Sequence, residues 1–507
     1  MRLARVKNAK RNIVWGGIER ITSIVLPFVV RTVFLKILGD EILGLNGLFS
    51  AILQVLNLAE LGFSNAVVYN MYKPIAEDDT AMVCALMNYY KKVYHIIGSC
   101  VFAIGIILIP FLPRLIKGEI PQGYNLYVLY IIYLFNTCIS YFLFAYKNSL
   151  LNAHQRDDIN SKVAVIISIA THVLQLAVLL LFNSYYIYLV VLPLMTISSN
   201  LIKAYYASKL FPNYKCSGAI PIDLHRTIRK NVLGLFIGKA CIVSRNSFDS
   251  IFLSAFVGLT TVAIYGNYYY IMTAITGILL MFRNSINAGI GNSIAMNSID
   301  KNHSDFELLS FLYAWLSGWC TVCFLVLYQP FMQIWVGDNM MFPFSTVILI
   351  CTYFYSLSLG DIRSIYSNAA GLFWEGRYYV ITEAVMNVIL NYVLGKLFGV
   401  NGIILATNLT IICINFVWGS RVLYKYYFKG LSVTRFYLRH IVYAFTTFVV
   451  SFITLTISNV IPYAGWSGFI LKGLICVVVP NVLFWVVYRR HPNYSGALSL
   501  MKRIIKN

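Results

Sequence analysis

The chain has 507 residues, of which 59% are hydrophobic and only 12% are charged. Soluble proteins carry about 25% charged residues, so this composition excludes a soluble fold and indicates an integral membrane protein of the helical kind. The formal net charge of +21 would suggest nucleic acid only if the cations formed a compact basic domain, and no such domain is present.

The first apolar stretch, residues 12–39, is long enough to cross a bilayer but carries Glu19, Arg20 and Arg31 around Pro27. It lacks a small-residue cleavage site, so we read it as a retained helix rather than a signal peptide. An unpaired charge near mid-bilayer costs at least about 2.5–3.5 kcal/mol. Because steps of four place Glu19, Pro27 and Arg31 on one face, we expect that face to line a wet cavity. The alternative is that the two arginines extend toward opposite interfaces.

Apolar runs separated by polar breaks predict fourteen transmembrane helices and an all-α fold. Their expected ranges are 12–36, 42–70, 93–113, 124–146, 162–182, 186–208, 231–257, 262–290, 308–334, 343–367, 379–398, 401–424, 436–460 and 467–488.

The distribution of basic residues predicts how the chain is oriented in the membrane. With the N-terminus placed in the cytoplasm, 30 of the 40 Lys and Arg residues lie on the cytoplasmic side and 5 outside. This bias follows the positive-inside rule, so we expect both termini in the cytoplasm.

The second half of the chain repeats the first at an offset of 219 residues. The offset pairs polar and small residues across the two halves, including Gly39 with Gly258, Tyr94 with Tyr313 and Gly118 with Gly337. Six helices per unit is an even number, so the units form a parallel repeat with a site expected between them. We expect an N-terminal lobe at 1–211, a basic cytoplasmic linker at 212–230, a second lobe at 231–430, and two further helices with a basic tail at 431–507.

Further ionisable residues lie inside the predicted helices of the second lobe. Lys239, Arg245 and Asp249 fall in the helix at 231–257, and Arg283 in the next. We predict that Arg20, Arg31, Lys239, Arg245 and Arg283 form a cationic cavity. Arg245 and Asp249 are also spaced as a pair that can neutralise itself on one helix, and that alternative stays open.

Two carboxylates, Glu60 and Glu383, have no cation within one turn of their own helices. They are the candidates for coupling transport to H⁺ or Na⁺, whereas Glu19 and Asp249 are expected to be charge partners. Glu383 shares a stripe with Asn387 and Asn391, and such stripes act either as interhelical hydrogen-bond contacts or as ligand contacts. Asp361 and Arg363 are expected at the membrane interface.

No motif for soluble catalysis is found. The sequence has no P-loop, no ATP-binding domain and no His, Asp or Cys cluster with metal-ligand spacing. Its ten cysteines are scattered, mostly through apolar runs, so neither a disulfide framework nor a metal site is expected. The pattern favours a transporter without a cofactor, other than a coupling ion, over an enzyme.

Two segments resemble a known family. Residues 31–79, which include NLAELGF, resemble the opening signature of Wzx-type polysaccharide repeat-unit flippases. LYQPFMQIWVGD at 327–338 is similar to the corresponding segment of their second lobe. These flippases share a superfamily with multidrug and toxic-compound extrusion (MATE) exporters and lipid II flippases.

The resemblance implies a MATE/flippase-like fold in a bacterial inner membrane. It also implies alternating-access export of an undecaprenyl-diphosphate-linked oligosaccharide for surface, capsular or exopolysaccharide synthesis. The partners implied are this substrate, membrane lipid and the polysaccharide polymerase machinery. One alternative is a MATE-like, cation-coupled drug exporter, which would need an acidic cavity. A membrane scaffold that transports nothing is the other, and it would not need intramembrane charge.

Overall fold

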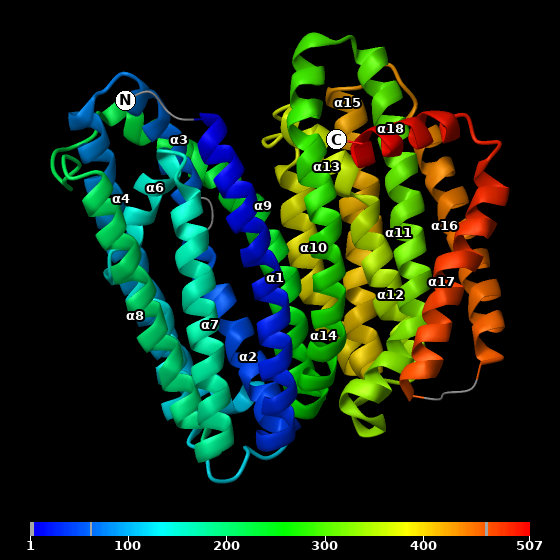
Figure 1. The fold of residues 1–507 in the computed structure, drawn as a ribbon, viewed down its shortest axis with the longest axis horizontal. Helices are drawn as coiled ribbons and strands as arrows, with labels where there is room; N and C mark the ends of the chain where they lie inside the picture. Colours follow the sequence, from blue (N-terminus) through cyan, green and yellow to red (C-terminus); the bar gives the residue numbers. More distant parts are fainter. Residues whose placement is uncertain (1–4, 61–62, 462–464, 507) are drawn as a thin grey trace. The chain divides into compact units, whose positions relative to one another are not determined.

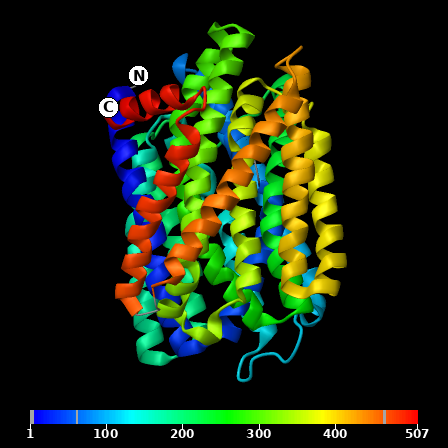
Figure 2. The ribbon, with the colours of Figure 1, turned by 90° about the vertical axis from the view of Figure 1, so that its right-hand side faces the viewer.

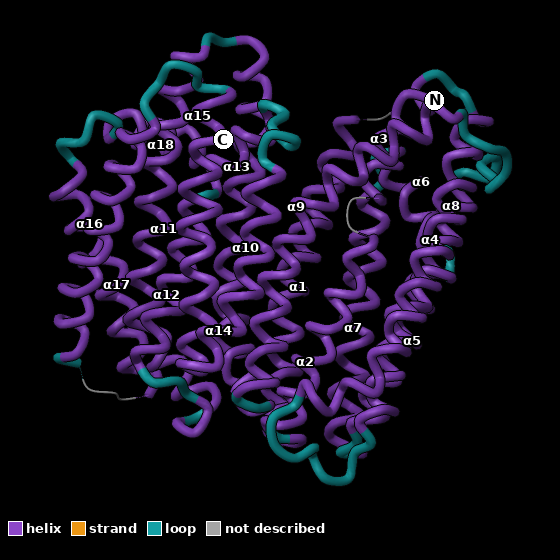
Figure 3. The backbone as a smooth tube through the Cα atoms, turned by 180° about the vertical axis from the view of Figure 1, so that it is seen from behind, coloured by secondary structure: helices purple, strands orange, loops and turns teal. Residues whose placement is uncertain are grey.

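The computed structural model describes residues 5–60, 63–461 and 465–506, and every regular element among them is a helix (Figure 3). Its contacts divide the chain into two compact units, Met1–Ala263 and Ile264–Asn507. The first unit therefore includes the helix at 222–256, which the repeat assigns to the second lobe. The lobe boundaries stay a prediction.

The first unit is a helical bundle. Its helices are α1 (Arg5–Leu38), α2 (Asp40–Leu56), α3 (Phe63–Ala76), α4 (Thr80–Leu108), α5 (Leu126–Phe142), α6 (Asn148–Ala153), α7 (Asp157–Phe182), α8 (Tyr185–Leu210) and α9 (Ile222–Phe256). α1 packs along α7, which packs on α8, and α9 packs on α2 (Figure 1).

The second unit begins within α10 (Leu259–Met296), whose first turns belong to the first unit. It continues with α11 (Ile299–Val336), α12 (Phe344–Leu359), α13 (Asp361–Ala369), α14 (Arg377–Leu409), the π-helical segment η5 (Thr410–Trp418), α15 (Gly419–Tyr426), α16 (Val433–Asn459), α17 (Gly465–Tyr488) and α18 (Tyr494–Lys506). α11 packs against α12, α16 and α17, and α18 lies across the end of this bundle (Figures 1 and 2).

All fourteen expected ranges are mostly helical in their described residues, but several are interrupted. The range 42–70 is broken by a short 3₁₀ turn, η1 (Asn57–Glu60), and 343–367 is broken between α12 and α13. α14 bends back at Gly399, where φ is 56° and ψ is −129°. Ten of the described helices, or eleven with a bent pair, are long and apolar enough to span a membrane. The chain is thus a multi-pass membrane protein, and the count of fourteen spans stays a prediction.

The internal repeat is visible in the local geometry of the backbone. Gly39 and Gly258 both have positive φ, at 87° and 131°, and so do Gly118 and Gly337, at 100° and 82°. Each pair is 219 residues apart, and only glycine adopts such φ values without strain. The helix caps repeat as well. Asp79 caps α4 by accepting from the amide of Met82, and at the same offset Ser298 caps α11 by accepting from Lys301. The predicted repeat is confirmed at these positions.

The segment after α8 is held against the first unit. The backbone carbonyl of Gly218 accepts from the Asn88 side chain at 2.8 Å, and the amide of Lys215 lies 3.2 Å from the Cys84 sulfur. Phe211 stacks on His154, and burial lowers the pKa of that imidazole. The start of the predicted linker is therefore an ordered part of the unit that precedes it.

Candidate functional site

Three of the predicted site residues lie on α1, and all three are half-buried. The Arg31 guanidinium donates to the backbone carbonyl of Ala263 at 3.3 Å, within the first unit. Glu19 is within electrostatic range of Lys203 on α8, so the neighbouring Arg20 is not the sole cation near it. Lys203 can therefore act as the counterion of Glu19 in place of Arg20.

The cations of α9 have a different environment. Lys239 is half-buried, whereas Arg245 and Asp249 are buried at 8% and 1% exposure. The two residues are four positions apart on the continuous helix α9, so they lie on the same face of it, one turn apart. Ser247 on the same helix donates to the Gln54 side chain of α2 at 3.1 Å, which ties α9 to the first unit.

The first unit thus contains four of the five predicted cavity cations on two helices. α1 packs chiefly on α7, whereas α9 packs on α2 and α3. The structure gives each cation a place within its own unit, and the single cationic cavity stays a prediction.

The fifth cation, Arg283 on α10, forms an ion pair with Asp361 at the start of α13. The other carboxylate oxygen of Asp361 accepts from the Tyr313 hydroxyl at 2.5 Å. Asp361 was expected at an interface with no assigned partner. Instead it neutralises Arg283 within the second unit, so this cation can meet an anionic ligand only in competition with Asp361.

Glu60 ends η1, at the break between α2 and α3. Its carboxylate accepts hydrogen bonds from the hydroxyls of Tyr94 and Tyr141, the latter at 2.8 Å. Tyr90 in turn donates to Tyr94 at 2.9 Å, and Tyr141 also donates to Asn57. These two tyrosines therefore hold the Glu60 side chain in place through its carboxylate. Sequence reasoning missed them because they come from α4 and α5.

The offset of 219 relates one tyrosine of each carboxylate cluster, but not the acids. Tyr94 and Tyr313 are repeat partners, and each donates to a carboxylate of its own unit. The acids differ: Glu60 lies at the first break of its unit, whereas Asp361 follows the break between α12 and α13. The sequence repeat shows that Tyr94 matches Tyr313, but it does not show that each tyrosine donates to a carboxylate.

Glu383 on α14 is only 1% exposed and is connected to a cation through an amide. Asn415 donates to the Glu383 carboxylate at 2.6 Å, and its side-chain oxygen accepts from the Arg363 guanidinium at 2.7 Å. Arg363, which the sequence places near the membrane interface, is enclosed by protein, with 1% of its side chain exposed. Sequence spacing within one helix could not reveal the cation near Glu383, because that cation, Arg363, belongs to a different helix, α13.

The backbone around Arg363 is shaped to admit it. A Cβ on Gly419 would lie 2.2 Å from the nearest guanidinium nitrogen, so only glycine leaves room at the start of α15. Asn415 itself belongs to the π-helical η5, and such insertions are common at functional sites.

The neighbouring stripe serves helix packing. The Asn387 amide donates to the Thr407 hydroxyl at 3.0 Å, and Asn391 donates to Asn387 at 3.3 Å. The Asn387–Thr407 bond joins the two arms of α14 on either side of Gly399, and the Asn391–Asn387 bond runs along one arm. Of the two readings of the stripe, the hydrogen-bond contact is the one seen here.

The described residues contain no group of three or more His, Cys, Asp or Glu side chains that could hold a metal ion. The ten cysteines are free thiols. What the site residues offer is charge and hydrogen bonding inside apolar helices.

Residues 9–285, more than half of the chain, match the polysaccharide biosynthesis protein family. The chain belongs to the polysaccharide biosynthesis protein family. The match confirms the resemblance to Wzx-type flippases, and it spans α1, α9 and most of α10, the helices that carry the predicted cations. No curated protein sequence matches the chain.

Solved structures show the fold. The lipid II flippase MurJ in an inward closed conformation is similar with a TM-score of 0.67 and 15% identity, over 94% of this chain and 98% of that one. An inward-facing MATE-family multidrug resistance transporter has a TM-score of 0.60 and 16% identity, over 80% and 98%. A MOP-superfamily transporter from Pyrococcus furiosus has a TM-score of 0.55 and 15% identity, over 82% and 96%. This member of the polysaccharide biosynthesis protein family therefore has the expected MATE/flippase-like fold.

The link between Glu383 and Arg363 predicts a large effect at Asn415. Each hydrogen bond to a charged group contributes about 1.5–3 kcal/mol, so Asn415→Ala, which removes two, should destabilise the second unit by about 3 kcal/mol or more. We expect a clear fall in the thermal unfolding midpoint of the detergent-purified protein.

Asn481→Ala is the matched control, because Asn481 bonds only to the Val477 carbonyl of its own helix and does so at an exposed position. An Asn415→Ala midpoint equal to that of Asn481→Ala would show that the bridging amide carries no stability.

Proposed function

We propose that this protein moves an undecaprenyl-diphosphate-linked oligosaccharide repeat unit from the cytoplasmic to the outer leaflet by alternating access. The product would supply surface, capsular or exopolysaccharide synthesis. The observation that carries the proposal is membership of a polysaccharide biosynthesis family in a chain with the fold of membrane transporters. A protein that moves its substrate, rather than altering it, needs no catalytic group.

The charges of the site residues support an anionic substrate. Arg20, Arg31, Lys239, Arg245 and Arg283 exceed the acids on the same helices, Glu19 and Asp249. A diphosphate suits such a surplus because arginine binds phosphate oxygens in a bidentate manner. Of the five, the half-buried Arg20 and Lys239 are the most available, whereas Arg283 is engaged by Asp361.

The alternative is a MATE-like exporter of cationic drugs coupled to Na⁺ or H⁺, and its support is the shared fold. A cationic ligand calls for acidic residues in the cavity, and the balance here is the opposite. The Pyrococcus furiosus transporter is described as having a binding pocket of reverse polarity that suggests a different function. The fold by itself therefore does not favour a cationic ligand.

The cation assignment predicts the loss of export. In the double variant Arg20→Gln, Arg245→Gln two positive charges are removed, and we expect surface polysaccharide to fall at least tenfold while the protein still inserts. The matching Arg→Lys double variant should keep part of the activity, because charge remains but the bidentate geometry is lost.

Arg114→Gln, Lys117→Gln is the control, since it removes two charges from exposed positions outside the cation set. Wild-type polysaccharide from a folded Arg20→Gln, Arg245→Gln protein would refute the assignment. Because Arg245 is buried, the amount and unfolding midpoint of each purified variant are measured in parallel.

The direction of export rests on the membrane orientation, which we propose from the positive-inside bias. Single cysteines at Gln122 and Ser217, both exposed, report it in a background lacking the native cysteines. We expect an impermeant thiol reagent added to intact cells to label Gln122→Cys only, and to label Ser217→Cys after the membrane is opened. The opposite pattern would reverse the orientation.

We further propose that export is coupled to H⁺ or Na⁺ through Glu60 or Glu383. An ion can bias alternating access only if it binds the two states differently. The tyrosine-held Glu60 can be neutralised without breaking a described ion pair with a cation, whereas Glu383 is linked through Asn415 to Arg363. Glu60 is therefore the stronger candidate.

Glu60→Gln should slow transport in proteoliposomes and flatten its dependence on an imposed proton or sodium gradient. Tyr90→Phe, which leaves both hydrogen bonds to Glu60 in place, serves as the control. Transport by the parent protein that ignores both gradients would end the coupling proposal.

A further inference from the structure

The ion pair between Arg283 and Asp361 has the features of a contact that can open. Its two side chains are 31% and 21% exposed, so neither is sealed inside the second unit. Arg363, by contrast, is 1% exposed and is held by the Tyr379 hydroxyl and the Asn415 side chain. An anion that approaches α10 can therefore reach the first guanidinium, whereas the second is enclosed by protein.

Asp361 keeps two sources of stabilisation when Arg283 is withdrawn. Its other carboxylate oxygen accepts from the Tyr313 hydroxyl at 2.5 Å. Tyr313 is only 2% exposed and its ring stacks on Phe282, the neighbour of Arg283, so this donor is fixed in place. Asp361 is also the first residue of α13, where the helix dipole favours a negative charge. The carboxylate is therefore not left uncompensated if the guanidinium turns to another anion.

Arg283 depends on Asp361 only while no other anion is present. An arginine without a counterion is costly inside an apolar helix, and the carboxylate removes that cost. Asn287, one turn later on the same face of α10, is exposed and can donate to an oxygen beside the guanidinium. A diphosphate carries more negative charge than a carboxylate and can accept from both side chains. It can therefore win the competition for Arg283.

We propose that Asp361 is a temporary counterion of Arg283. The diphosphate of the substrate displaces the Asp361 carboxylate, which then rests on Tyr313 and the start of α13, and the carboxylate returns when the substrate leaves. No covalent bond changes and no proton moves in this exchange, so both residues stay ionised. Asp361 is thus a positioning residue for the cation. The inference rests on the proposed function, which supplies the ligand.

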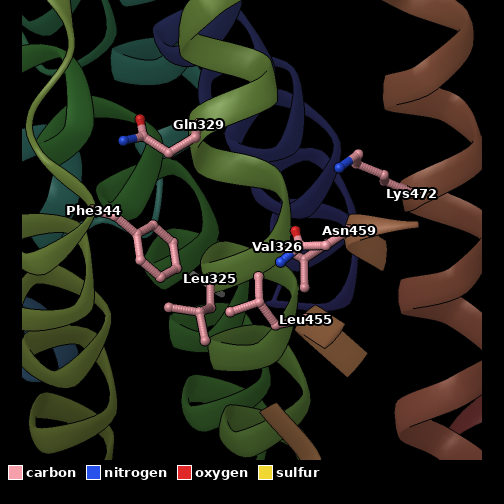
Figure 4. Close-up of a pocket in the computed structure, with 7 residues that line it drawn as sticks. All are labelled: Leu325, Val326, Gln329, Phe344, Leu455, Asn459 and Lys472. Atoms are coloured by element: carbon pink, nitrogen blue, oxygen red, sulfur yellow. The ribbon is translucent and has the colours of Figure 1, made fainter. Parts of the chain in front are cut away.

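The pocket drawn in Figure 4 is a different place in the second unit where a lipid could bind. It is lined by residues of α11, α12, α16 and α17, among them Gln329 and Asn459, and neither Arg283 nor Asp361 is part of the lining. Asn459→Asp, at an exposed position of that lining, would repel an anion there and leave Arg283 unchanged. This variant separates binding in the pocket from binding at α10.

The test measures the binding of radiolabelled undecaprenyl diphosphate to the full chain, purified in a neutral detergent. Asp361→Asn removes the competing charge and keeps the shape of the side chain. We expect its apparent Kd to fall roughly fivefold, the scale of a partly exposed ion pair. Tyr313→Phe removes a donor that supports the displaced carboxylate, so its apparent Kd should rise. Asp361→Glu keeps the charge and should bind like the parent protein.

Export should change in the opposite direction to affinity. Without a carboxylate to take Arg283 back, the ligand leaves slowly, so Asp361→Asn should yield less surface polysaccharide than Asp361→Glu although it binds more tightly. A loss of packing alone would weaken binding. In the double variant Arg283→Gln, Asp361→Asn the gain in affinity should vanish, because the effects of two residues in contact are not additive.

Glu307→Gln is the matched control, because Glu307 forms an ion pair with Arg439 in the same unit at a similar exposure, 21% and 33%. Neither arginine 439 nor its partner belongs to the predicted cation set. Glu307→Gln and Asn459→Asp should both bind undecaprenyl diphosphate like the parent protein. Unlabelled inorganic diphosphate should compete poorly, because it lacks the chain.

A parent protein that does not bind undecaprenyl diphosphate would contradict the proposed function, and the exchange with it. Binding by the parent, with no gain in a folded Asp361→Asn, would overturn the exchange alone. An equal gain in Glu307→Gln, or a loss in Asn459→Asp, would place the ligand elsewhere. Inorganic diphosphate that competes as well as the lipid would overturn the lipid-linked ligand. If Asp361→Asn does not fold, an affinity of Tyr313→Phe equal to that of the parent overturns the proposal.

Discussion

The constraint on which this structure depends is the cost of placing charge in an apolar interior. A helix that crosses a bilayer leaves an ionised side chain with few partners, so each must be matched by protein groups or by a wet cavity. The chain meets this demand with contacts between helices. Asp361 pairs with Arg283 and accepts a hydrogen bond from Tyr313. Glu60 accepts hydrogen bonds from two tyrosines. Glu383 is linked to Arg363 through the side chain of Asn415. These networks decide which charges remain for a ligand.

Much of the fold could be predicted from the sequence, because hydropathy and the repeat both leave signals along the chain. Every predicted span is mostly helical where it is described, and the offset of 219 matched glycines that share a positive φ. The breaks were not predicted. The turn at Asn57–Glu60 and the π-helical Thr410–Trp418 lie in apolar stretches whose composition differs little from that of a continuous helix. Hydropathy reports burial in lipid, and it carries no information on where the hydrogen-bond ladder shifts.

The site was less predictable, since its contacts join residues far apart in the chain. Spacing rules find candidate partners one turn away, as for Arg245 and Asp249. They cannot find Tyr94 for Glu60, which is 34 residues away, or Asn415 for Glu383, which is 32 residues away. The surroundings of Arg363 were also not predictable from the sequence, because its position late in a predicted span suggested only a membrane interface. Its burial depends on the glycine at 419, contributed by another element.

The two units therefore differ in a way that the repeat does not suggest. Repeat-related tyrosines donate to both acids, but Asp361 also pairs with an arginine, whereas Glu60 accepts from neutral tyrosine hydroxyls. A proton added to Asp361 would break an ion pair, while one added to Glu60 would only rearrange hydrogen bonds. If Glu60 is the coupling residue that we propose, one unit would keep both charges of its pair while the other changes its charge. A transporter needs such a difference if a single ion is to favour one of its states.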